Sequence, residues 1–178
     1  MRFAGVTFII LLFSCQQKSE KLFWINKTVN DKNDFLFMAE STNVEIIKPE
    51  NLQKYLTPNE LNEIQIVESK LNSIDTNPTT YPQFKEFGDI YKSSNFLLRV
   101  LFREGDNSLG RDYKFILRTY QHDWKIIDSY DIACWIKREE KYCFGSIDEN
   151  LIIEKSCEAD PILEKYLINI KGVFEKIR

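Results

Sequence analysis

The sequence predicts an α+β fold, with one capped helix packed on a curved antiparallel β-meander and short strands near the N-terminus. Two observations carry this prediction. A helix-start signal at residue 57 precedes apolar residues at helical spacing, and from residue 95 apolar and polar residues alternate. With 178 residues, 43% of them hydrophobic, the chain can bury one core. We therefore expect a single domain over residues 22–178.

The predicted helix begins at Thr57-Pro58-Asn59-Glu60. A hydroxyl at the N-cap, proline at the first helical position and glutamate at the third form a capping box. Apolar residues then recur at helical spacing: Leu61, Ile64, Val67, Leu71 and Ile74. The pattern predicts a helix over residues 58–74 whose apolar stripe faces the core.

The predicted meander begins at Asn95 with a period of two, which places Phe96, Leu98, Val100 and Phe102 on one face. A turn is expected at Gly105-Asp106-Asn107. Further apolar stretches are separated by turn residues and cover 113–120, 124–132, 142–147 and 151–155. Five strands with short connections predict an antiparallel meander.

The segments outside the meander carry weaker signals. Short apolar runs at 22–25, 35–39 and 44–48 predict N-terminal strands. Residues 75–94 show no clear period and predict a long loop, anchored to the core or contacting a ligand through four aromatic residues. These are Tyr81, Phe84, Phe87 and Tyr91.

The C-terminal tail suits either an amphipathic helix or a hairpin around Lys171-Gly172. Glycine and β-branched residues disfavour the interior of a helix. We therefore favour the hairpin.

At the N-terminus, Arg2 precedes an apolar stretch from Gly5 to Phe13. The stretch is shorter than the roughly 20 residues of a membrane-spanning helix but fits the about 7–15 residues of a signal peptide's apolar region. It ends in Leu12-Phe13-Ser14-Cys15. This resembles the lipobox of bacterial lipoproteins, an aliphatic residue and two small residues before a cysteine, although Phe13 is larger than that pattern has.

The resemblance implies a lipid-anchored protein of the bacterial cell envelope. Residues 1–14 would be the signal peptide, Cys15 would carry a diacylglyceryl group and acyl chains such as palmitate, and residues 15–21 would form a polar tether. More than one acyl chain makes anchoring stable. Gln16 replaces the Asp of inner-membrane retention, which favours the outer membrane, on its periplasmic or outer face. The composition is similar to that of small lipoproteins of the Bacteroidetes kind.

Three further cysteines, Cys134, Cys143 and Cys157, would lie in an oxidising compartment where thiols pair. A hairpin that turns at Arg138-Glu139 places Cys134 opposite Cys143, and Cys157 on the next strand shares that face. The pairings Cys134–Cys143 and Cys143–Cys157 therefore compete. One thiol remains, either buried and inert or available for intermolecular pairing.

The composition argues against several classes of function. A net charge of −3 gives no basis for binding nucleic acid. The cysteine spacings fit no metal-ligand pattern, and the single histidine, His122, falls at a predicted hairpin tip. The sequence has no phosphate-binding or nucleophile motif. We therefore expect no metal, no cofactor and no catalytic residue.

The binding candidates are arginines on the second face of the predicted sheet and aromatic residues of the predicted loop. They are Arg99, Arg103, Arg111 and Arg118 with Tyr81 and Phe84. The arginines would bind an anion if they converged, but they also suit the solvated face of an antiparallel sheet, which we favour.

The function expected from these observations is that of a lipid-anchored, non-catalytic binding module that meets an envelope protein or a small ligand. Alternatives are an inhibitor or immunity-type protein, a structural envelope component, and an envelope hydrolase using Asp128 or Asp131. The two aspartates would point to opposite sheet faces, which makes them a poor catalytic pair.

Overall fold

The computed structural model describes residues 21–25, 45–71, 83–107, 110–136 and 139–177. The first elements are β1 (Lys21–Ile25), β2 (Glu45–Ile46), α2 (Pro49–Tyr55) and α3 (Pro58–Leu71). The strands that follow are β3 (Gln83–Lys92), β4 (Leu97–Asn107), β5 (Gly110–Tyr120), β6 (Ile126–Ile136), β7 (Lys141–Asp148), β8 (Ile152–Cys157), β9 (Glu164–Ile168) and β10 (Phe174–Ile177).

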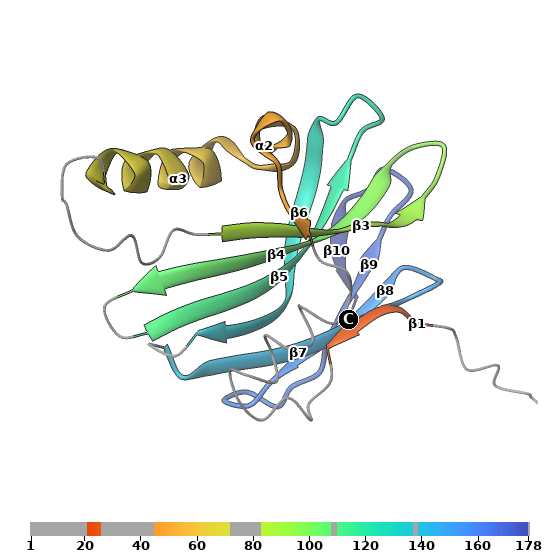
Figure 1. The fold of residues 1–178 in the computed structure, drawn as a ribbon. Helices are drawn as coiled ribbons and strands as arrows, with labels where there is room; N and C mark the ends of the chain where they lie inside the picture. Colours follow the sequence, from red (N-terminus) through yellow and green to blue (C-terminus); the bar gives the residue numbers. More distant parts are fainter. Residues whose placement is uncertain (1–20, 26–44, 72–82, 108–109, 137–138, 178) are drawn as a thin grey trace, which may run out of the picture.

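The predicted α+β class is wrong, because the described residues form a β-rich fold of ten strands with only two short helices. The strands from β2 to β10 lie in one antiparallel sheet in chain order, so the predicted meander is confirmed and is longer than expected. The strand content was underestimated because the segment at 83–92, expected to be a loop, is a strand. In Figure 1 both helices lie on the same side of β3, β4 and β5.

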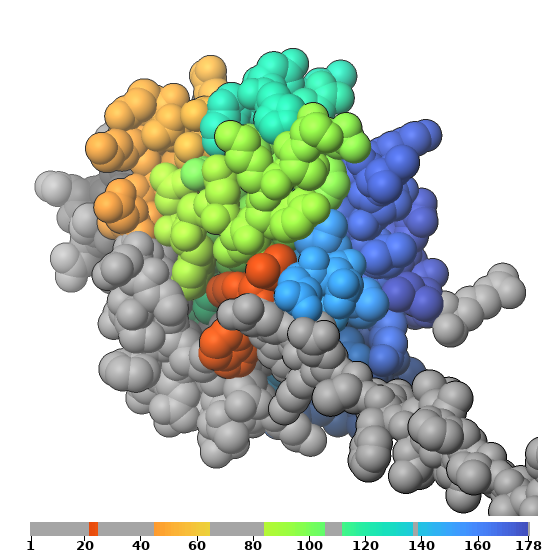
Figure 2. All heavy atoms as spheres, turned by 90° about the vertical axis from the view of Figure 1, so that its right-hand side faces the viewer, coloured from red at the N-terminus to blue at the C-terminus, as the bar shows by residue number. Residues whose placement is uncertain are grey.

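β1 is the exception to chain order, because it pairs with β7. β6 pairs with β7 only from Cys134↔Cys143 to Ile136↔Lys141, and from Gly145 onward β1 is a partner of β7 instead. The space-filling view shows β1 between the green β3–β4 region and the blue β7–β8 region (Figure 2). The N-terminal strand therefore fills the place where β6 and β7 diverge.

The sheet buries apolar side chains on both faces. The inner core collects the alternating residues of β4 and β5 with residues of β6, β7 and β8, among them Leu98, Phe102, Phe115, Ile132 and Ile153. The outer core lies under α2 and holds Ile47, Tyr55, Leu56, Phe84, Leu97, Leu101, Ile116 and Tyr120. The predicted inward alternation from Phe96 is confirmed, but the second face is covered by α2.

Helix α3 begins with the predicted capping box. The Glu60 carboxylate accepts the Thr57 backbone N–H at 2.7 Å, and the Thr57 hydroxyl accepts the Glu60 N–H at 3.3 Å. The helix extends to Leu71, and residues 72–74 lie outside the described residues. Helix α2 was not predicted, because its N-cap is Lys48, which makes no side-chain cap, and only Pro49 marks its start in the sequence.

The predicted loop over 75–94 is wrong for its second half, which forms β3. Irregular pairing around Asp89 and a positive φ of 83° at Gly88 break the alternation along this strand. Ile90 and Tyr91, although adjacent, both pack on the inner core. Because of these irregularities, the segment lacks the regular alternation of apolar and polar residues from which a strand is predicted. Residues 75–82, Tyr81 among them, lie outside the described residues.

Of two predicted turns, one lies at a different position and the other is confirmed. The turn expected at Gly105 lies further along, because β4 and β5 pair as far as Asn107↔Gly110. The C-terminal hairpin is confirmed: β9 and β10 are antiparallel, and Gly172, with φ of 82°, lies in the turn. The helical alternative for the tail is therefore wrong.

Of the predicted N-terminal strands, 22–25 falls within β1, and 44–48 is reduced to the two residues of β2. The run at 35–39 lies outside the described residues, as do the predicted signal peptide, Cys15 and all of the tether except Lys21. Within the described part of the chain, neither helix is long and apolar enough to cross a membrane.

Candidate functional site

The arginine candidates do not converge on an open surface. Arg99 and Arg118 are buried, at 9% and 2% exposure, so their expected place on a solvated face is wrong. Arg99 pairs with Glu86 and Asp89, and Arg118 with Glu60. These carboxylates compensate the charges, and both arginines serve to hold elements together.

The remaining binding candidates either make contacts within the fold or lie outside the described residues. Arg103 forms an ion pair with Glu63 of α3 at 2.8 Å. Phe84 is buried in the outer core. The side chain of Arg111 and the whole of Tyr81 lie outside what the structure describes.

The two aspartates lie on opposite faces of β6, as the sequence indicated. Asp128 is opposite Thr119 of the inner face, and its carboxylate accepts the Phe174 N–H of β10 at 3.0 Å. Asp131 is opposite Ile116 of the outer core and pairs with Lys114 at 2.9 Å. No substrate atom could contact both carboxylates from one side of the sheet.

Cys134, Cys143 and Cys157 lie on three neighbouring strands. A disulfide joins Cys143 of β7 to Cys157 of β8, while Cys134 of β6 keeps a free, buried thiol. His122 is exposed in the turn between β5 and β6. The sequence had left both pairings of Cys143 open, and the structure contains the one with Cys157.

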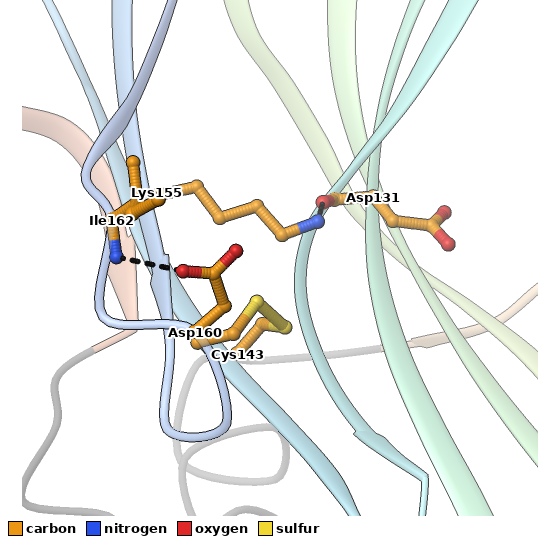
Figure 3. The surroundings of a disulfide bond; sticks show 6 residues. Asp131, Cys143, Lys155, Asp160 and Ile162 are labelled. Atoms are coloured by element: carbon orange, nitrogen blue, oxygen red, sulfur yellow. Dashed lines mark hydrogen bonds between the residues drawn. A yellow bond between two sulfur atoms is a disulfide. The ribbon is translucent and has the colours of Figure 1, made fainter. Parts of the chain in front are cut away.

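Lys155 of β8 is the residue that sequence reasoning missed. It is only 9% exposed, and its Nζ donates to the Asp131 carbonyl oxygen of β6 at 2.6 Å (Figure 3). Burial lowers the pKa of its amine. Its position two residues after Ile153, an inner-core residue, was the available signal, because the alternation directs both side chains inward.

A pocket of about 320 Å³ opens beside this lysine and the disulfide. Its walls include Lys155, Cys157, Asp160, Ile162 and Glu164. Residues 158–163, which we call the β8–β9 loop, form its rim. The Asp160 side chain accepts the Ile162 N–H at 3.3 Å, which helps fix the loop (Figure 3).

A second pocket of about 270 Å³ is lined by Ile162, Leu163, Glu164, Lys165, Lys176 and Ile177. Ile162 and Glu164 line both pockets, so the two pockets adjoin where the loop meets β9. Ile162 is 68% exposed and Leu163 50%. Two adjacent exposed aliphatic side chains between concave surfaces form the best candidate binding site in the described part of the chain.

Comparison of the chain with protein-family models, curated proteins and solved structures finds no match. Among the described residues no group of three or more His, Cys, Asp or Glu could hold a metal ion. The functional argument therefore rests on the geometry of this chain.

Proposed function

We propose that this protein is a lipid-anchored, non-catalytic binding module of the bacterial cell envelope, which contacts a partner protein through the β8–β9 loop. The observation that carries the proposal is the exposure of Ile162 and Leu163 between two pockets. Burying such side chains against a partner contributes about 25 cal/mol per Å² of apolar surface. Lys165, Lys176 and Glu164 around them would form a polar rim.

The disulfide supports the proposed compartment. Cys143 and Cys157 are joined inside a folded β-sheet, and such bonds persist mainly in oxidising environments such as the bacterial periplasm and the cell surface. The N-terminal residues, with their resemblance to a lipobox ending at Cys15, supply the route to that compartment and the anchor there.

The non-catalytic part of the proposal is supported by the partners of the two aspartates. Asp128 accepts two backbone N–H groups, those of Ser129 and Phe174, and Asp131 forms an ion pair with Lys114. Their separate faces and fixed partners suit structural roles better than joint acid–base catalysis. Confinement by the anchor would instead raise the effective concentration of the loop near envelope partners.

The anchor is tested by the intact mass of the protein extracted from the membrane fraction of its host. A mass for residues 15–178 plus acyl chains is the expected result. The Cys15→Ser chain should lose the lipid and leave the membrane fraction. An unlipidated full-length chain in the soluble fraction would contradict the anchor.

The binding surface is tested by placing a photo-cross-linking amino acid at position 162 in cells. Position 46 is a matched control, because Ile46 is 64% exposed and lies on β2, at the opposite end of the sheet order from β10. A discrete cross-linked species from position 162 alone is expected. No product, or the same product from both positions, would refute binding through the loop.

A further inference from the structure

Three cysteines form one row across adjacent strands. The register pairs Cys134 of β6 with Cys143 of β7, and Cys143 with Cys157 of β8. Directly opposite residues in an antiparallel pair project from the same face and are near neighbours. Cys143 therefore has a cysteine neighbour on each side, and the disulfide uses only one of them.

We propose that this row is a thiol–disulfide exchange site, in which the disulfide moves between Cys143–Cys157 and Cys134–Cys143. The Cys134 thiolate attacks Sγ of Cys143 and forms a new S–S bond. The bond from Cys143 to Cys157 breaks, and Cys157 leaves as a thiolate, which takes up the proton that Cys134 released. The step is an isomerisation, so it needs neither an oxidant nor a reductant.

The strand order suits the direction of attack. Displacement at sulfur requires the entering and leaving sulfurs on opposite sides of the central one. β6 and β8 flank β7, so Cys134 and Cys157 lie on opposite sides of Cys143. A pair formed directly between Cys134 and Cys157 would have to pass across β7.

Cys143 also lies where two ladders end. The pair Cys134↔Cys143 is the last of the β6–β7 ladder before the strands diverge, and Cys143↔Cys157 is the outermost pair of the β7–β8 ladder. Cys157 is the final residue of β8, and the β8–β9 loop follows it. Releasing Cys157 from the disulfide therefore frees a strand end and leaves the interior of the sheet intact.

Exchange would change where the free thiol lies. Cys134 is 2% exposed in the present arrangement, whereas Cys157 is partly exposed and lines the 320 Å³ pocket next to Ile162. After exchange, the Cys157 thiolate could attack a disulfide of a second molecule, giving a mixed disulfide and releasing that molecule's other sulfur as a thiol. The site would thus take disulfide-containing ligands.

The charges around Cys134 affect the rate. Burial raises the pKa of its thiol, Lys155, Lys141 and Lys114 oppose this effect, and Asp131 reinforces it. Since the thiolate is the attacking species, exchange should become faster as pH rises. The exchange does not depend on whether the β8–β9 loop binds a partner.

The first experiment asks whether the fold accepts the second disulfide. Every full-length variant carries Cys15→Ser, so that only the row can react. Cys157→Ser should form Cys134–Cys143 in air, with the loss of two hydrogens in the intact mass and the bond located by peptide mapping. Cys143→Ser is the control and should keep two thiols, because β7 lies between the two remaining cysteines, Cys134 and Cys157. A folded Cys157→Ser chain that keeps both thiols would refute the proposal.

The second experiment tests exchange in the protein with all three cysteines and does not rely on those variants folding. The full-length chain that carries only Cys15→Ser is treated with N-ethylmaleimide without reductant, and the adduct is mapped. The expected adduct is on Cys157, with Cys134–Cys143 as the disulfide, and it forms several-fold faster at mildly alkaline than at neutral pH. Cys134→Ser should give no adduct. An adduct on Cys134 alone, or no adduct on the chain that carries only Cys15→Ser, would overturn the proposal.

Discussion

The Glu60 carboxylate stabilises two elements at once. It caps α3 through the Thr57 N–H and also receives the Arg118 guanidinium of β5 through two contacts, at 2.7 and 2.9 Å. Arg118 donates further to the Tyr55 carbonyl oxygen at the end of α2. The start of one helix and the end of the other are thereby fixed to the sheet through one buried cation.

Glu60→Gln should destabilise the fold by about 3–5 kcal/mol, because it leaves Arg118 buried without its counter-charge while glutamine still suits the capping box. Glu63→Gln is the matched control. It lies three residues further along the same helix, is 49% exposed and pairs with Arg103, so its loss should cost less than about 1 kcal/mol. Urea denaturation of both variants measures the difference, and equal costs would contradict the role of Glu60.

The same pair predicts a pH dependence. Burial tends to raise the pKa of Glu60, but the hydrogen bonds and charge of Arg118 and the Thr57 N–H outweigh it, so the pKa is lowered from 4.5. A lowered pKa of an acid contributes stability above its unfolded value and loses it as pH falls through the folded value. The free energy of unfolding should therefore fall below pH 4.5 more steeply than in Glu60→Gln. Parallel curves for the two proteins would rule this out.

Gly145→Ala should destabilise the sheet by about 1–3 kcal/mol or more. A Cβ at this position would lie 2.5 Å from the Ile132 carbonyl oxygen and 2.9 Å from that of Glu154, both of which are backbone atoms that cannot turn aside. At Gly105 the nearest contact is the flexible end of Arg103 at 3.1 Å. Gly105→Ala should therefore cost much less, and thermal unfolding of the two variants tests this order.

Asp128→Ala should loosen the C-terminal hairpin. The Asp128 carboxylate accepts the Phe174 N–H, and next to it the Thr119 hydroxyl donates to the Gly172 carbonyl oxygen at 2.6 Å. Losing a hydrogen bond to a charged acceptor costs about 1.5–3 kcal/mol.

Hydrogen exchange in β10 should accelerate in this variant, and Asp123→Ala, in the exposed turn before β6, should leave β10 unchanged. Unchanged protection of β10 in Asp128→Ala would show that the contact does not hold the hairpin.

The features predicted correctly were those whose causes lie within a few residues. The capping box at Thr57 and the alternation from Phe96 to Phe102 are complete in the sequence itself, and Gly172 marks the final turn. β3 was missed because its irregular pairing at Asp89 cancels the local pattern, and α2 because Lys48 is no cap.

The candidate site could not be predicted from a local sequence pattern. Tyr81 and Phe84 drew attention as aromatic residues of an expected loop, whereas the exposed pair Ile162-Leu163 reads as an ordinary apolar stretch in the sequence. Whether an aliphatic side chain is buried depends on what packs against it. The described residues leave Ile162 68% exposed and Leu163 50% exposed.

The sequence by itself determined the meander, the helix start and the set of cysteines that could pair, and it favoured the tail hairpin. The tertiary structure decided which ones do pair, that Arg118 and Lys155 are buried, and that β1 is inserted where β6 and β7 diverge. The physical reason is the distance along the chain over which each interaction acts. Capping and alternation act between near neighbours in the chain, whereas burial and disulfide choice depend on which distant strands the fold brings side by side.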